Sequence, residues 1–174
     1  VTVEFSVLTN AENGARVAML QQIQKDLARI GIRINVLPKP FVEVLEHLKG
    51  PRNFDAILLG WGADVPSDPM FSKNVLFSSG QDHLWSPSQG RKPQTKWEGQ
   101  IDELLRQNLA SQHYETRKPL MDKIQVILSD QLPQIPLVVE YLGAAADVRV
   151  GNFEPYALDG GLYWNLEQLF LRKD

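Results

Sequence analysis

The sequence predicts an α/β fold with a central, largely parallel sheet flanked by helices. Strand-like and helix-like segments alternate along residues 1–59, in the order strand, helix, strand, helix, strand. In addition, residues 54–59 (FDAILL) are apolar on both faces, which is typical of a central strand covered by helices on each side. A chain of 174 residues can bury one sizeable core, so we expect a single α/β lobe over residues 1–174.

Local signals define the first elements. The opening VTVEFSVL alternates like a strand, and Asn10 or Asn13 can cap the following helix, which Gly31 ends. Residues 32–37 (IRINVL) form the next predicted strand, which two prolines break before a short helix. The expected inward positions are Val17, Leu20, Ile23, Leu27 and Ile30 on the first helix and Phe41, Leu45 and Leu48 on the second; the prolines are Pro38 and Pro40.

The second half predicts a loop and two helices. Residues 78–96 are rich in loop-forming types, although His83, Leu84 and Trp85 suggest that part of this loop packs down. Pro119 complicates the second helix, because proline fits best where its missing N–H would be unpaired; we therefore expect a late start with Thr116 as the N-cap. Residues 137–142 are expected to form a strand. The apolar stripes are Trp97, Ile101, Leu104, Leu105 and Leu109, then Leu120, Met121, Ile124, Ile127 and Leu128.

Composition excludes several classes of protein. A net charge of -3 with 22% charged residues is that of an ordinary globular protein, so no nucleic-acid partner is expected. The absence of cysteine excludes disulfides and thiolate metal sites and leaves the compartment open. No run of about 18 apolar residues is present, and any signal peptide would have been removed.

Signatures of catalysis and of metal binding are missing. His47, His83 and His113 stand far apart without ligand spacing, so we expect surface or partly packed histidines and no metal or cofactor. No nucleophile elbow or glycine-rich phosphate loop occurs. Asp64 and Asp68 could serve as an acid–base pair, but four residues apart in a proline-containing loop they are more typical of turn and cap residues.

The stretch FDAILLGWGADVPSDP combines a buried strand with an unusual exit. Trp61 could be a core residue shielding the sheet, but ligands of open α/β sheets bind just beyond the carboxyl ends of the strands. There Gly60 and Gly62 would let backbone approach a ligand, Trp61 would offer a flat apolar wall, and Asp64 would offer a partner for an ammonium group.

Three stretches carry a family resemblance over most of the chain: TNAENGARVAMLQQIQKDLARIGIRINV, NFDAILLGWGADVPSDPMF and IDELLRQNLASQHYETRKPLMDKIQVILSDQLPQIPLV. Together they resemble the C-terminal lobe of extracytoplasmic solute-binding proteins, family 5, which serve oligopeptide, dipeptide and nickel ABC importers. The resemblance implies a lobe of the class II periplasmic binding protein type and places the ligand-binding residues at Gly60, Trp61, Gly62, Ala63 and Asp64. Leu58 departs from oligopeptide binders that carry a basic residue at this position.

The resemblance also implies a function and a setting. The expected function is a non-catalytic, monomeric receptor that captures a small solute, with peptide the leading ligand, and delivers it to an ABC permease in the membrane. Its location would be periplasmic or extracellular, with a membrane anchor in the full-length protein as one option. The alternatives are a hydrolase using Asp64 and Asp68, and a ligand-sensing effector domain of a regulator.

The C-terminal segment resembles the part that returns toward the other lobe. It covers residues 148–174, and its aromatic residues Tyr156, Tyr163 and Trp164 would pack across the lobe junction. In this chain alone we expect these rings to fold back on their own lobe or to contact a neighbouring molecule.

Overall fold

The computed structural model describes residues 3–50, 54–62, 68, 72–85, 92–139, 143–156 and 164–172. The chain divides into two compact units, Val1–Trp61 and Gly62–Asp174. Each unit has a hydrophobic cluster of its own. The single lobe expected over residues 1–174 therefore stays a prediction.

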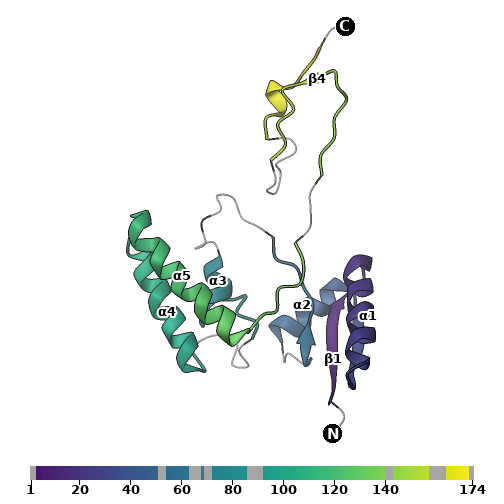
Figure 1. Cartoon of the computed structure of the whole chain (residues 1–174), viewed down its shortest axis with the longest axis vertical. Coiled ribbons are helices and arrows are strands. Elements are labelled where there is room, and N and C mark those ends of the chain that lie inside the picture. The colour runs from purple at the N-terminus through teal and green to yellow at the C-terminus, as the bar shows by residue number, and fades with distance from the viewer. Residues whose placement is uncertain are drawn as a thin grey trace. The chain divides into compact units, whose positions relative to one another are not determined.

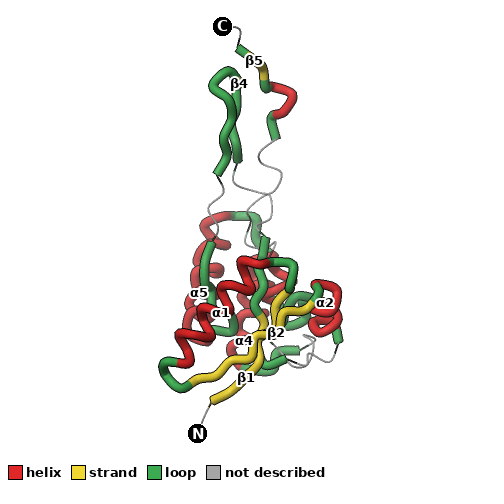
Figure 2. Tube along the Cα trace, turned by 90° about the vertical axis from the view of Figure 1, so that its right-hand side faces the viewer, coloured by secondary structure: helices red, strands yellow, loops and turns green. Residues whose placement is uncertain are grey.

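A parallel sheet with helices forms the first unit, as the alternating sequence pattern predicts. Its elements are β1 (Val3–Asn10), α1 (Gly14–Ala28), β2 (Ile32–Lys39), α2 (Phe41–Lys49) and β3 (Ala56–Ile57). The strand order is β2-β1-β3, and both pairings are parallel. Figures 1 and 2 show α1 running alongside β1. The predicted α/β class is confirmed.

The two helices of this unit cover opposite faces of the sheet (Figure 1). Leu20 of α1 packs with Val7 and Ile34, which point to one face because side chains alternate along a strand. On α2 the fully buried residue is Val44. The prediction that Phe41 faces inward is wrong: it is 45% exposed, since it is the first residue of the helix and the sheet-facing position comes one turn later.

The strands differ from expectation in two ways. Residues 54–59 were expected to form a central strand, but β1 is central and the two-residue β3 lies at an edge of the described sheet with half-buried side chains. The strand β2 continues through Pro38, where a break was expected. An edge strand tolerates proline because only one of its sides carries ladder hydrogen bonds.

The second unit is built on helices. Its elements are α3 (Lys73–Leu76), α4 (Lys96–Leu109), α5 (Tyr114–Gln131), β4 (Val150–Gly151), the 3-10 helix η2 (Leu166–Gln168) and β5 (Phe170–Leu171). The helices α4 and α5 lie side by side (Figure 1). Their core is Ile101, Leu105 and Ile124, three positions of the two predicted stripes.

The predicted late start of α5 is wrong. The helix begins at Tyr114 after the N-cap His113 and runs through Pro119 without interruption. Proline at this position removes one backbone hydrogen bond in the second turn. The packing of Ile124 and its neighbours against α4, together with the side-chain anchors of Arg117 described below, favours the helix despite that loss.

The C-terminal residues make a small antiparallel pairing of their own, Gly151 with Phe170. The Phe170 ring covers Gly151 so closely that a Cβ there would overlap it. Residues 137–139 have no strand pairing among the described residues, and residues 140–142 of that predicted strand lie outside them. Tyr156 and Trp164 are 54% and 57% exposed, so the expected packing of these rings onto the chain is not seen; Tyr163 lies outside the described residues.

Among the described residues, no helix combines the length and the apolar character that crossing a membrane requires.

Candidate functional site

The candidate site lies where the parallel strands of the first unit end. Parallel pairing brings their carboxyl ends to one edge, so Asn10 at the end of β1 stands beside Lys39 at the end of β2. The chain leaving β3 reaches Gly60 and Trp61 three and four residues after Ile57. This edge therefore gathers residues from three separate segments.

A buried hydroxyl fixes the exit of the third strand. The Leu58 N–H donates to the Leu8 carbonyl at 2.8 Å, and the Thr9 hydroxyl donates to the Leu58 carbonyl at 2.9 Å. Thr9 is fully buried, so this bond satisfies a polar group that would otherwise be costly. The sequence analysis missed Thr9, because a threonine at a strand end carries no distinctive signal.

Trp61 is 51% exposed, so it is not the core residue shielding the sheet that was one of its two interpretations. Gly60 is also exposed, and among the described residues no atom lies within 4 Å of the point where a Cβ on Gly62 would stand. Ala63 and Asp64 lie outside the described residues. The ligand-binding role of this stretch thus stays a prediction, with its tryptophan accessible to solvent.

Arg16 reaches this edge from the first turn of α1. The Asn13 side chain caps the helix by accepting from the Arg16 backbone N–H at 3.0 Å, and the Asn10 carbonyl oxygen Oδ1 accepts from Arg16 Nη1 at 2.9 Å. The guanidinium lies against Gly60: Cζ is 3.3 Å from the point where a Cβ on Gly60 would stand, and Nη2 is closer still. A glycine at position 60 is what makes room for this side chain.

Two carboxylates near the same strand ends already have partners. Glu12 accepts from the Phe41 N–H at 3.0 Å, and this bond is the main cause that lowers the pKa of Glu12 from its ordinary value. Glu43 pairs with Lys39 at 3.3 Å. Neither acid is paired with Arg16 among the described residues.

Asp68 is held by an arginine in the second unit. Its two carboxylate oxygens accept from Arg117 Nη1 and Nη2 at 2.8 and 2.6 Å, while Arg117 Nε donates to Asn108 at 2.9 Å. The bond to Asp68 is the main cause that raises the pKa of Arg117. This fork-to-fork pairing gives Asp68 an anchoring role and lends no support to an acid–base role, while its expected role in a turn or cap stays a prediction.

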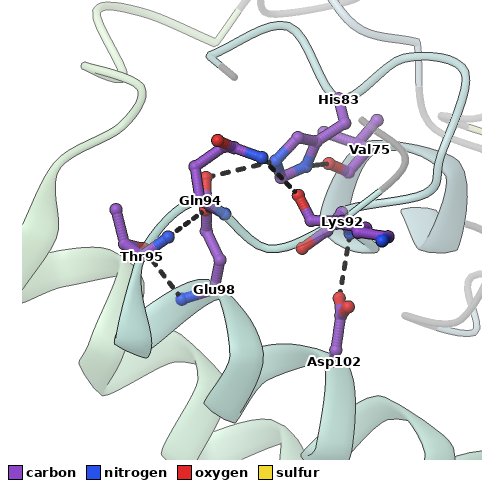
Figure 3. Close-up of polar contacts among 8 residues, drawn as sticks. Val75, His83, Lys92, Gln94, Thr95, Glu98 and Asp102 are labelled. Carbon is purple, nitrogen blue, oxygen red and sulfur yellow. Dashed lines mark hydrogen bonds and ion pairs between the residues drawn. The ribbon is translucent and has the colours of Figure 1, made fainter. Parts of the chain in front are cut away.

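His83 is fully buried, so the expectation of a surface or partly packed histidine is wrong; Figure 3 shows the polar contacts that surround it. Its Nδ1 lies 3.0 Å from the Val75 carbonyl oxygen and its Nε2 3.4 Å from Glu98 Oε1. Glu98 in turn completes a capping box with Thr95 at the start of α4. The loop residue His83 is thus tied to a helix start, which explains why this part of the loop packs down.

Glu98 is ionised more easily than an ordinary glutamate. Burial by itself would raise the pKa of its carboxyl, but the backbone N–H groups of Gln94 and Thr95 and the ring of His83 outweigh it, so the pKa is lowered. No group of three or more His, Cys, Asp or Glu side chains able to hold a metal ion occurs in the part of the chain that the structure describes. The network is a structural one.

Comparison with known proteins supports the family resemblance. A family model described as "Bacterial extracellular solute-binding proteins, family 5 Middle" matches residues 2–83. A relative from Deinococcus radiodurans, "Probable ABC transporter-binding protein", is 29% identical over 84% of this chain and 26% of its own length.

Two solved structures show the same fold. A dipeptide-binding protein from Pseudoalteromonas sp. SM9913 in complex with Met-Leu is 25% identical, with a TM-score of 0.60 over 75% of this chain and 25% of that one. The periplasmic binding protein MelB from Agrobacterium fabrum C58 in complex with stachyose is 18% identical, with a TM-score of 0.63 over 75% of this chain and 20% of that one. The chain spans between a fifth and about a quarter of the length of these proteins. Residues 2–83 thus match the model of the bacterial extracellular solute-binding proteins of family 5, and the chain is similar to an ABC transporter-binding protein over most of its length.

Proposed function

We propose that this chain is part of the substrate-binding component of an ABC importer and that it binds a small solute, a peptide first of all, at the carboxyl edge of β1-β2-β3. The observation that carries the proposal is Trp61, a large apolar ring that stays half exposed at the strand ends of a parallel sheet. At this place the exposed indole offers a flat apolar face that a ligand could contact.

The surroundings of Trp61 suit a ligand with a backbone of its own. Gly60 and Gly62 present no side chain, so an extended ligand could approach the main chain closely. The Leu58 exit is fixed by Thr9, which gives the edge a defined shape before any ligand arrives. Recognition through main-chain groups and one aromatic wall tolerates varied side chains, as a peptide receptor requires.

Peptide is the leading ligand on two grounds. The stretch Gly60–Asp64 matches the G-W-x-x-D element of peptide-binding relatives, in which Asp64 would pair with the ligand's ammonium group. The neighbour bound to Met-Leu is also more similar in sequence than the one bound to stachyose, 25% against 18% identity. Leu58, in place of a basic residue, argues against a close copy of the oligopeptide binders.

The family resemblance and the need to enclose a ligand on all sides support an import setting. One edge encloses a ligand only in part, so a second lobe would close over it, and closure would be favoured by the ligand's higher affinity for the closed state. The exposed aromatic residues Tyr156 and Trp164 support a return of residues 148–174 toward that lobe. The receptor would act as a monomer in the periplasm or outside the cell and deliver the solute to a membrane permease.

Two experiments test this function. Native mass spectrometry of the complete gene product should show a co-purified small solute, and exchange against a peptide library should identify the sequences bound. Asp64→Asn should weaken binding of peptides with a free amine and leave N-acetylated peptides unchanged, whereas Asp130→Asn, an exposed site on α5, should affect neither. A receptor that binds no solute, or that turns peptides over, would contradict the proposal.

A further inference from the structure

We propose that Arg16 is a specificity-determining residue of this edge and selects ligands that carry a carboxylate. The inference deepens the proposed function and rests on it in one respect, namely that the carboxyl edge of β1-β2-β3 is where the solute binds. The family resemblance and the comparisons assign no role to Arg16, and the sequence analysis did not single it out.

The position of Arg16 is fixed from two sides. Its backbone belongs to the first turn of α1, where Asn13 caps the helix, and its Nη1 donates to Asn10 at the end of β1. Its guanidinium packs against Gly60, next in sequence to Trp61. An arginine held in this way loses little side-chain entropy when it binds a ligand, since much of that cost is met on folding.

The two Arg16 nitrogens without an acceptor among the described residues have the geometry that binds a carboxylate. Nη1 is bonded to Asn10, while Nε and Nη2 have no hydrogen-bond acceptor among the described residues. These two groups present parallel N–H bonds along one edge of the planar guanidinium, the geometry that binds both oxygens of a carboxylate at once. Arg117 shows the contrasting case, since both of its terminal nitrogens are already bonded to Asp68.

Among the described residues, the charges around Arg16 leave its guanidinium available for an anion. Glu12 is engaged by the Phe41 N–H and Glu43 by Lys39, and no ion pair of Arg16 occurs within the described ranges. Arg16 is also partly buried, so a carboxylate bonded there is less screened by water than at a fully exposed arginine. The ligand's carboxylate would lie beside Gly60, and its adjacent apolar part could contact Trp61.

A carboxylate can reach this site from two sources, the C-terminus of a peptide or an acidic side chain. The shared chemistry can be tested first, without knowledge of the natural solute. In the 174-residue chain labelled with ¹⁵N, acetate is titrated against chloride at constant ionic strength and the Nε–Hε resonances of the arginines are followed. The Arg16 resonance should move progressively with acetate, and that of Arg29, the exposed C-cap residue of the same helix, should move much less. Equal movement of the two would overturn the proposal.

The second arm measures selectivity in the complete gene product. Trialanine with a free C-terminus, trialanine amide and Ala-Glu-Ala amide are compared by calorimetry in the wild type, Arg16→Gln and Arg29→Gln. Arg16→Gln should lose about ten- to a hundredfold in affinity for a carboxylate-bearing peptide and leave trialanine amide unchanged, while Arg29→Gln should change none of the three. Loss with free trialanine alone assigns the C-terminal carboxylate, and loss with Ala-Glu-Ala amide assigns the acidic side chain.

Gly60→Ala gives an independent variant that keeps the charge. A Cβ there would stand too close to Nη2, so the flexible guanidinium must shift, and the preference for the carboxylate should fall, though by less than in Arg16→Gln. A purely structural role of Arg16 would lower affinity for acid and amide alike, which would contradict the proposal. If no peptide binds while acetate still moves the Arg16 resonance selectively, the peptide function fails and the anion site stands.

Discussion

Replacing Glu98 with alanine is expected to destabilise the second unit by about 3 kcal/mol. The side chain accepts from the Gln94 and Thr95 backbone N–H groups at 2.5 and 2.8 Å and lies 3.4 Å from the buried ring of His83. Hydrogen bonds to a charged group contribute about 1.5–3 kcal/mol each, and the long contact to His83 adds little. Removing the carboxylate also removes the cost of burying it, so each bond is counted at the low end of that range. Two such bonds give a destabilisation of about 3 kcal/mol.

Urea unfolding of the 174-residue chain, together with hydrogen exchange of the α4 amides, measures this change. Glu103→Ala is the matched control, since Glu103 is on the same helix but its side chain is 58% exposed and it bonds only to exposed partners. The control should change stability very little. If Glu98→Ala is no more destabilising than Glu103→Ala, the capping network does not hold the start of α4.

Glu98 also makes the stability of the folded chain depend on pH. The pKa of Glu98 is lower in the folded chain than its ordinary value, so the unfolded chain takes up the proton first as the pH falls. The stabilisation is therefore complete above the ordinary glutamate pKa and is lost as the pH falls from there through the lowered one. Glu98→Gln should flatten this acid limb of the stability curve, and an unchanged limb would show that another group controls it.

Two further changes test the anchors of the two units. Thr9→Val removes the buried hydroxyl that donates to Leu58 and should destabilise the first unit by about 1–2 kcal/mol in urea unfolding. The control Thr116→Val, on the exposed face of α5, should have little effect. Equal effects of the two changes would argue against the Thr9 bond. Asp68→Asn should cost about 1 kcal/mol, because the pair with Arg117 is partly exposed, and should speed hydrogen exchange in the first turns of α5; unchanged exchange would refute the anchoring role.

Local patterns predicted the first unit well because its elements follow short-range rules. The Asn13 cap, the helix that ends before Gly31 and the alternation of β1 each depend on a few neighbouring residues. The prediction for Phe41 failed because the sequence does not show where on a helix the sheet makes contact. The prediction for Pro119 failed because packing and anchors far along the chain offset the loss of one hydrogen bond.

Some residues of the candidate site could be identified from the sequence, and others only from the structure. The glycine and tryptophan at positions 60 and 61 were identified from their place after an apolar strand and from the family motif, but Arg16 and Thr9 were not. Both act through partners about 45 to 50 residues away in sequence, Gly60 and Leu58, and no local pattern reports such a pairing. His83 was misjudged for a similar reason, since its burial depends on a helix start fifteen residues later.

The sequence by itself determined the α/β class, the Asn13 cap of the first helix, the order of the first five elements and the resemblance to a family, because periodicity, turn chemistry and motifs act over short distances or are shared by relatives. Only the tertiary structure decided which strand is central, which carboxylates are engaged and which donors of Arg16 have no acceptor among the described residues. These depend on which distant segments meet, and parallel pairing brings Asn10, Arg16 and Gly60 to one edge although the chain separates them.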